Sequence, residues 1–448
     1  MDRKENIFKR IKNSVSDGSI NPSSDRDRIL LVLKSLILHL HPPMVNEKTI
    51  KFNHTFGLGG MAVVLICLQF ITGLLLRFTY APFPGSAYDS ILHLQSTVLF
   101  GQLIRNIHHW SGLLLVIITS LHLLRVFFTS GFHGKRQFNW VIGVCLLLLV
   151  VFSNFTGYLL PWDQLAYWAV TVATGMLEYI PIIGTGLMEI LLGGKQVGSS
   201  TLLIFYNLHT GIFPILIILI MAFHFWRVRK AGGVVVPADK SENKMVPAVP
   251  NLVAKEFVVM LVLLAFVFLL ALIFDAPLLE KANPAFSPNP AKAPWYFLGI
   301  QELMLHFHPL FSAIIIPITS LIFLLLIPYF LYETEDNGVW FYSGKGKQLA
   351  IRSAVISGAA SLAFILINEF LFKSGKLLGF LPDEISNGLI PFIIFMSGFY
   401  GFYKFLINKK GANKNEAIQT LVVSILTVFI VLTIVGIFFR GKGMALTF

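Results

Sequence analysis

Residues 101–128, GQLIRNIHHWSGLLLVIITSLHLLRVFF, form one long apolar segment that carries His108 and His122, fourteen positions apart. A second apolar segment carries His209 and His224, fifteen positions apart. At a rise of about 1.5 Å per residue, these intervals measure about 21 and 22.5 Å and are close to whole numbers of helical turns. Each pair therefore lies on roughly one helix face, with one histidine near each side of an apolar core about 30 Å thick.

The composition predicts that these segments lie in a membrane. Apolar residues make up 55% of the chain and charged residues only 13%, and the mean hydropathy is +0.74. Such values lie well outside the range of soluble proteins. The fold class that we expect is all-α, a polytopic transmembrane protein with about nine spans. The expected spans cover residues 56–78, 97–128, 137–160, 200–226, 256–274, 308–332, 349–372, 388–406 and 417–439.

Lysine and arginine concentrate on one side of this topology. The amino-terminal segment and every second loop after it hold 25 of them, and the opposite set holds 7. Because positive residues accumulate in cytoplasmic loops, we expect a cytoplasmic amino terminus. The formal net charge of +12 belongs mostly to this asymmetry, so it indicates contact with anionic lipid headgroups rather than with nucleic acid.

The same pattern divides the chain into four parts. The first is a cytoplasmic tail with a surface helix, and the second is a four-helix bundle that carries both histidine pairs. The third contains a Pro-Trp-Tyr loop, and the fourth adds three transmembrane helices. In order, these parts are residues 1–53, 54–232, 233–345 and 346–448.

If two such histidine helices pack face to face, they form two sites, one above the other. Each site has one imidazole from each helix. This is the geometry that holds two haems across a membrane. One histidine in an apolar helix is more often a packing residue, but two pairs at nearly equal spacing favour ligation. His109 faces about 100° away from its neighbour and is expected to be no ligand. Cys67 and Cys145 lie inside apolar spans, which excludes an iron–sulfur cluster and a C-x-x-C-H haem attachment.

Arginines and glycines near the histidines support this interpretation. Arg105 lies three residues before His108, and Arg125 three after His122. Each could neutralise a haem propionate at a membrane face, although snorkelling to headgroups explains them equally well. Two glycines in the first span and two in the third repeat the fourteen-residue interval. They would leave room for a porphyrin at each level. For any single glycine, close helix packing is the simpler explanation. The four glycines are Gly59, Gly73, Gly143 and Gly157.

Two loop motifs accompany the histidine pairs: GYLLPWDQLAYWAV at 157–170 and APWYFLGIQE at 293–302. With them, residues 42–332 resemble the cytochrome b subunit of quinol:cytochrome c oxidoreductases of the bc and bf types. The fifteen-residue interval, WDQ at 162–164 and the run HFWRVRK resemble the bf-type branch. The part that corresponds to that branch's separate small subunit is fused here.

The resemblance implies an oxidoreductase subunit with two non-covalent b haems. His108 and His209 would ligate an outer, low-potential haem, and His122 and His224 an inner, high-potential haem. The two arginines would occupy propionate-binding positions, and the four glycines haem-packing positions. Gly57 stands where the bf-type branch attaches an extra haem through a cysteine, so no covalent c-type haem is expected.

The resemblance also implies two quinone sites, and by analogy it favours menaquinone. Pro294 stands where the family's Pro-Glu-Trp-Tyr motif has a proton-accepting glutamate. Another group, with Glu302 the nearest downstream carboxylate, or water must then take the proton. Quinol oxidation at the outer face would involve Tyr158, Pro294, Trp295, Tyr296 and Glu302, and quinone reduction at the inner face Arg229, Lys255 and Glu256.

The implied function is a Q cycle in a bacterial cytoplasmic membrane. Quinol would pass one electron to a Rieske iron–sulfur protein, and on to a c-type cytochrome, and the other across the membrane to quinone, in a dimeric complex. The alternatives are a dihaem membrane anchor of another respiratory dehydrogenase and a non-redox transporter. A dihaem anchor gives no reason for the two loop motifs. A transporter would be expected to show an internal repeat, which the sequence lacks.

Overall fold

The computed structural model describes residues 22–34, 41–238, 243–330, 332, 337–372 and 380–447. Among these residues, nine helices are long and apolar enough to span a membrane, so the predicted all-α polytopic fold is confirmed. The spanning helices are α4 (Leu58–Arg77), α6 (Gly101–Phe128), α7 (Gln137–Leu159), α10 (Ser199–Asn207) continued by η4 (Leu208–Ile212) and α11 (Phe213–Lys230), α12 (Ala248–Ile273), η6 (Leu310–Ile315) with α14 (Ile316–Leu326) and η7 (Ile327–Tyr329), α15 (Gly344–Ile367) with η8 (Asn368–Phe372), η9 (Ile385–Leu389) with α16 (Ile390–Asn408), and α17 (Lys414–Phe438).

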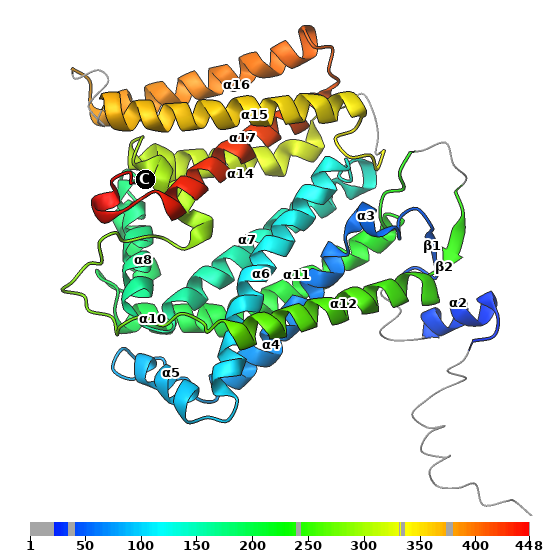
Figure 1. Ribbon diagram of the computed structural model, residues 1–448, viewed down its shortest axis with the longest axis horizontal. Coiled ribbons are helices and arrows are strands. Elements are labelled where there is room, and N and C mark those ends of the chain that lie inside the picture. Colours follow the sequence, from blue (N-terminus) through cyan, green and yellow to red (C-terminus); the bar gives the residue numbers. More distant parts are fainter. Residues whose placement is uncertain are drawn as a thin grey trace, which may run out of the picture.

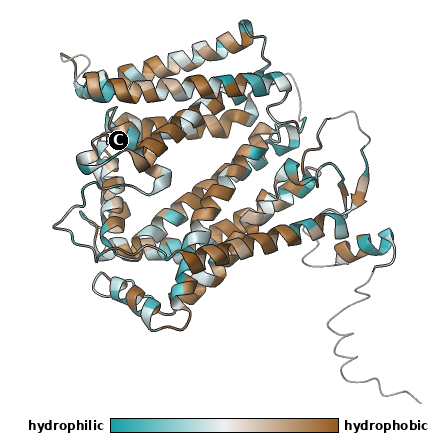
Figure 2. Ribbon diagram, viewed as in Figure 1, coloured by the Kyte–Doolittle hydropathy of each residue, from teal (hydrophilic) through white to brown (hydrophobic). Residues whose placement is uncertain are grey.

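Hydrophobicity explains why these segments are helical. A bilayer core offers no water to backbone groups, so each segment satisfies its own N–H and C=O groups within a helix. Apolar residues run along the helices, and polar residues gather at their ends and in the connections (Figure 2). The start of α17 shows the local signal clearly, because the side chains of Asn413 and Glu416 form a reciprocal capping box there.

Five helices pack around the first apolar core. Leu65 of α4, Val116 of α6 and Val150 of α7 are buried in it with Ile217 of α11 and Val267 of α12. A second group, α14 to α17, lies along one side of these helices (Figure 1). Phe127, Trp140, Ile327 and Val422 belong to a shared buried cluster that joins the two groups.

The two ends of the bundle differ, and we name them by their elements. The strand end carries the short antiparallel pair β1 (Met44–Asn46) and β2 (Met245–Pro247). Helix α2 (Asp25–Lys34) lies in the part predicted as a tail with a surface helix, residues 1–53, of which residues 1–21 and 35–40 lie outside the described residues.

The loop-helix end is the opposite one and consists of short helices. The long connections at this end fold into these helices. They form α5 (Ala87–Ser96), α8 (Gln164–Gly175), η3 (Met176–Tyr179), α9 (Gly184–Leu192), η5 (Trp295–Phe297) and α13 (Leu298–Met304). Asp163 caps α8 by accepting a hydrogen bond from the Ala166 N–H at 2.9 Å. Leu159, Trp162 and Phe205 pack beneath these helices in one buried cluster.

Candidate functional site

The structure brings the four histidines together in two pairs, as their spacing predicts. At the loop-helix end, the ring centroids of His108 and His209 lie 6.1 Å apart with the ring planes at 78°. At the strand end, His122 and His224 are close enough to interact electrostatically. Protein covers each of the four residues only partly. Each level therefore offers two imidazoles that come from different helices.

A π-helical turn explains why the two intervals differ by one residue. His209 lies in η4, which interrupts the helix formed by α10 and α11. A π-turn accommodates one extra residue within a helix. The fifteen-residue interval of this helix therefore spans the same levels as the fourteen-residue interval of α6.

Hydrogen bonds orient the two histidines of the loop-helix end. The Thr72 hydroxyl donates to the Leu68 carbonyl at 2.7 Å, so its oxygen can accept from His108 Nδ1, which lies 2.9 Å away. His209 Nδ1 lies 2.8 Å from the Ser153 carbonyl oxygen and donates to it. Donation through Nδ1 leaves the Nε2 lone pair of each ring free, as a metal-ligating histidine requires.

A glycine stands beside every one of the four histidines. A Cβ added at Gly59 or Gly73 would lie 3.4 or 3.2 Å from a histidine Cε1 atom, and at Gly143 the distance would be 3.8 Å. At Gly157 it would overlap the ring. Gly60, the sequence neighbour of Gly59, has open space instead. The four pairs are Gly59 with His122, Gly73 with His108, Gly143 with His224, and Gly157 with His209.

The two arginines predicted at propionate positions have different surroundings. Arg105 donates to the backbone carbonyls of Ala276 and Pro277, both at 2.7 Å. Arg125 donates through Nε to the His54 carbonyl at 2.8 Å, but its Nη2 is buried with no hydrogen-bond partner. Because an unsatisfied buried donor is costly, an anionic group fits beside Arg125.

The donor set fits a haem better than a bare metal ion. Within the described ranges, no three histidine, cysteine or acidic side chains come together at one metal site. A haem brings its own equatorial ligands and needs only axial ones. Two facing imidazoles with a glycine beside each match that requirement.

Two tyrosines from the predicted outer quinol site lie close together at the loop-helix end. Tyr158 lies in the last turn of α7, and Tyr296 lies in η5, where the Trp295 and Tyr296 ring centroids are 5.6 Å apart. Burial raises the pKa of Tyr296, and the nearby Tyr158 adds to the rise. The Tyr296 hydroxyl is buried with no partner, so it is available to a bound polar group.

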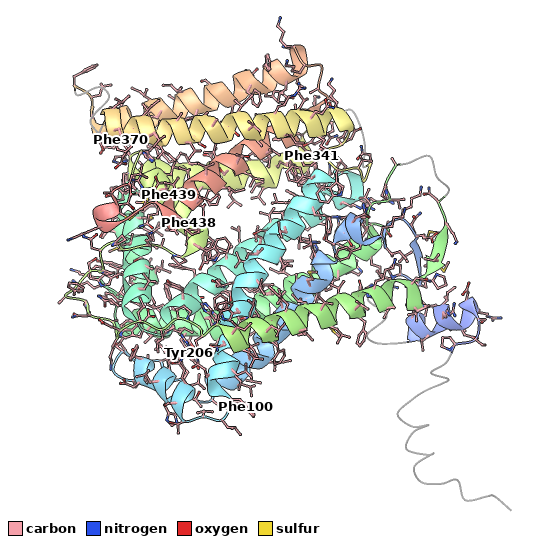
Figure 3. All side chains as sticks on the ribbon, in the orientation of Figure 1. Phe100, Tyr206, Phe341, Phe370, Phe438 and Phe439 are labelled. Carbon is pink, nitrogen blue, oxygen red and sulfur yellow. The ribbon has the colours of Figure 1, made fainter. Side chains whose placement is uncertain are left out.

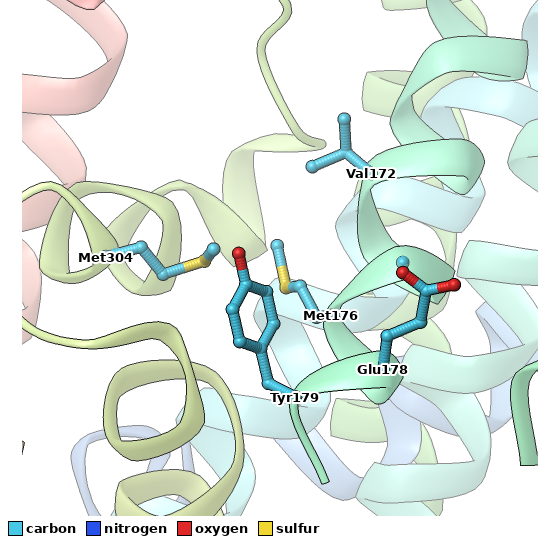
Figure 4. A pocket seen from close by; sticks show the side chains of 6 residues that line it. Val172, Met176, Glu178, Tyr179 and Met304 are labelled. Atoms are coloured by element: carbon cyan, nitrogen blue, oxygen red, sulfur yellow. The ribbon is translucent and has the colours of Figure 1, made fainter. Parts of the chain in front are cut away.

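A cavity of about 520 Å³ opens at the same end of the molecule. It lies between α8 and η3 on one side and α13 on the other (Figure 4). No sequence motif marks its lining residues, and they meet only in the folded chain. They are Val172, Gly175, Met176, Glu178, Tyr179 and Met304.

Glu302 is fully buried and ion-paired. Its carboxylate accepts hydrogen bonds from Arg440 at 2.6 and 2.9 Å, and from His306 at 3.2 Å. Burial opposes ionisation of Glu302, but the hydrogen bonds from His306 and Arg440 prevail, and its pKa is lowered. A carboxylate held in its ionised form is a weak proton acceptor, so Glu302 is better suited to hold structure than to receive a quinol proton.

The residues predicted for quinone reduction lie toward the strand end. Arg229 is in the last turn of α11. Lys255 Nζ donates to the Ile50 carbonyl at 3.0 Å, and Glu256 Oε2 lies 3.1 Å from His41 Nε2. The hydrogen bond to Glu256 raises the pKa of His41, against the effect of burial. These contacts tie the start of α12 to the segment before α4.

The fold and its two histidine levels define a class, the helical multi-pass membrane proteins that carry paired histidines in one bundle. Comparison with known sequences then identifies the family. The family described as "Cytochrome b/b6/petB" matches residues 45–232. Cytochrome b6 of Acaryochloris marina is 44% identical over 180 residues, which cover 40% of this chain and 84% of that protein. Cytochrome b6 of Synechococcus elongatus is 43% identical over 180 residues, which cover the same fractions of the two chains. The chain belongs to the cytochrome b/b6 family.

A solved structure extends the likeness beyond the matched bundle. A chain titled "Hyperthermophilic respiratory Complex III" superposes with a TM-score of 0.61 and 24% identity, covering 85% of this chain and 91% of that one. At this identity the match shows a common fold. It includes helices that the cytochrome b6 relatives do not cover.

Proposed function

We propose that this protein is the dihaem cytochrome b subunit of a quinol:cytochrome c oxidoreductase. The observation that carries the proposal is the repeated unit at both levels, two histidines from different helices with a glycine beside each ring. His108 and His209 hold the outer haem, and His122 and His224 the inner one. When bound, the haems supply one-electron redox chemistry between the two membrane faces.

Charge sets the orientation of this proposed subunit. The segments at the strand end belong to the set that holds 25 lysines and arginines, against 7 in the opposite set. We therefore place the strand end and the amino terminus in the cytoplasm of a bacterial cell. Moving one electron across the membrane against 100 mV costs about 2.3 kcal/mol, so oxidation at one face and reduction at the other stores energy.

Quinol oxidation belongs at the loop-helix end, between the Tyr158–Tyr296 pair and the cavity. Val172 and the two methionines of the cavity offer an apolar surface to a quinol ring. Pro294 cannot take a proton, and Glu302 is already paired with Arg440. Glu178 contributes the carboxylate of the cavity lining, and we assign it the acceptor role.

Quinone reduction belongs at the strand end, near His224. Arg229, Lys255 and Glu256 provide charged groups at the ends of α11 and α12. The partners proposed for the whole complex are a Rieske iron–sulfur protein and a c-type cytochrome, in a dimer. Membership of the cytochrome b/b6 family argues against the transporter and the anchor subunit, and menaquinone remains the quinone favoured by analogy.

Haem content and quinol oxidation test this function directly. The purified membrane complex is expected to contain two b haems per chain by pyridine haemochrome absorbance, and a short-tailed naphthoquinol should reduce them. A preparation without haem would restore the transporter alternative. A preparation with two haems that no quinol reduces would favour the anchor subunit.

Substitution of Glu178 tests the proton acceptor. We expect Glu178→Gln to lower kcat for quinol oxidation about 100-fold, because general-base catalysis typically contributes a factor of this order. Haem content should stay at the wild-type value. Glu189→Gln, on the neighbouring helix α9 and outside the cavity lining, is the matched control and should keep the wild-type rate. Equal rates in the two variants would exclude Glu178 as the acceptor.

A further inference from the structure

An arginine just after the end of α17 is buried against the outer-site helix α13. Arg440 is 3% exposed and donates to both oxygens of Glu302. Its Nη1 also donates to Glu369 Oε2 at 2.9 Å and to the Met444 carbonyl at 3.0 Å. The ends of α15 and α17, near Phe370 and Phe438 in Figure 3, lie on the same side of the molecule as α8 in Figure 1.

His306 extends this cluster on the side of Glu302. Its Nε2 lies 3.2 Å from Glu302 Oε1, and its Nδ1 lies 2.6 Å from the Asn368 amide nitrogen. The amide must donate to Nδ1, so the ring carries its proton on Nε2 and donates it to Glu302. His306 and Arg440 therefore satisfy the buried carboxylate together, and Asn368 of η8 orients His306.

Close backbone packing accompanies the ion pair. A Cβ added at Gly299 of α13 would lie 2.6 Å from a Phe429 ring carbon and 2.7 Å from the Thr433 hydroxyl oxygen. A Cβ at Gly436 of α17 would lie 3.3 Å from the Leu298 carbonyl oxygen. Glycine at both positions lets the two helices approach closely. Lys292, just before the Pro-Trp-Tyr loop, donates a hydrogen bond of 2.9 Å to the Ile437 carbonyl of α17.

Helix α13 connects this cluster to the proposed quinol cavity. It begins directly after η5, which contains Tyr296, and ends at Met304, which lines the cavity. We propose that the carboxyl-terminal helix α17 supports the outer quinol site. Arg440, which follows this helix, acts as a positioning residue that fixes α13 through Glu302. This inference rests on the proposed function, and it gives a role to a helix that no sequence motif explained.

The geometry of arginine is essential to this role. Its planar fork bonds both oxygens of one carboxylate and still reaches Glu369, whereas a lysine offers a single ammonium group. Removing one partner of a buried pair leaves an uncompensated charge, but removing both partners is often tolerated. Tyr296 and Met304 should therefore keep their positions when the pair is intact or when both partners are removed, and should shift when only one partner is removed.

Kinetics of the complete complex test this positioning role. In Arg440→Gln we expect both b haems to remain and the KM for a short-tailed naphthoquinol to rise about tenfold, with kcat changed less. Arg440→Lys should give an intermediate KM. The double variant Arg440→Gln/Glu302→Gln should return the KM toward the wild-type value, because the coupling within the pair makes the two effects non-additive. Arg352→Gln, an exposed arginine on α15, is the matched control.

Each outcome is decisive. If Arg440→Gln does not accumulate, Arg440→Lys and Gly299→Ala replace it, and an unchanged KM in both would overturn the inference. An unchanged KM in Arg440→Gln with wild-type haem content would overturn it directly. Wild-type protein without quinol-dependent haem reduction would instead defeat the proposed function, so the two failures are distinguishable.

Discussion

Replacing His122 by leucine is expected to remove one b haem from each chain and to leave the other in place. Leucine fills a similar volume but has no nitrogen to ligate iron. His224 alone cannot supply both axial ligands of the haem at the strand end. The second level lies about 21 Å away along α6 and keeps His108 and His209. Pyridine haemochrome absorbance per chain should fall from two haems to about one.

His109→Leu is the matched control for this substitution. His109 lies in the same helix, and its ring packs against Trp110 with the centroids 5.0 Å apart. It contributes to neither pair, so both haems should remain. Two haems in His122→Leu, or one haem in His109→Leu, would contradict the assignment of the levels.

The helices and the histidine pairs were predictable because their causes are local. Apolar runs of sufficient length determine the spans, and the helical repeat determines which residues share a face. The glycine positions followed from the same repeat. The structure adds that each glycine faces a histidine of another helix, and that η4 absorbs the extra residue before His224.

The ion pair between Glu302 of α13 and Arg440 was not predictable, because it depends on tertiary packing. Arg440 and Glu302 are 138 positions apart, and no periodicity or motif connects them. The sequence alone left Glu302 as a candidate proton acceptor, since burial and ion pairing depend on the packing of α17. The cavity is similar, because Met304 meets the residues of η3 only after both loops have folded.

The glycines provide a second prediction with a large effect. Gly59→Leu is expected to remove the inner haem, whereas Gly60→Leu should retain both. A Cβ at Gly59 already lies 3.4 Å from His122 Cε1, and three further carbons would enter the space that a porphyrin needs. A Cβ at Gly60 has nothing within 4 Å, so a side chain there starts in open space.

The pairing of these two variants separates haem exclusion from a general effect on the helix. Both lose a glycine from the first turn of α4, and leucine favours helix over glycine by about 0.8 kcal/mol at either position. Any difference in haem content must therefore come from the face that the side chain occupies. About one haem per chain in Gly59→Leu and two in Gly60→Leu would support haem packing against Gly59. Equal haem content in the two variants would mean that the glycine serves helix packing alone.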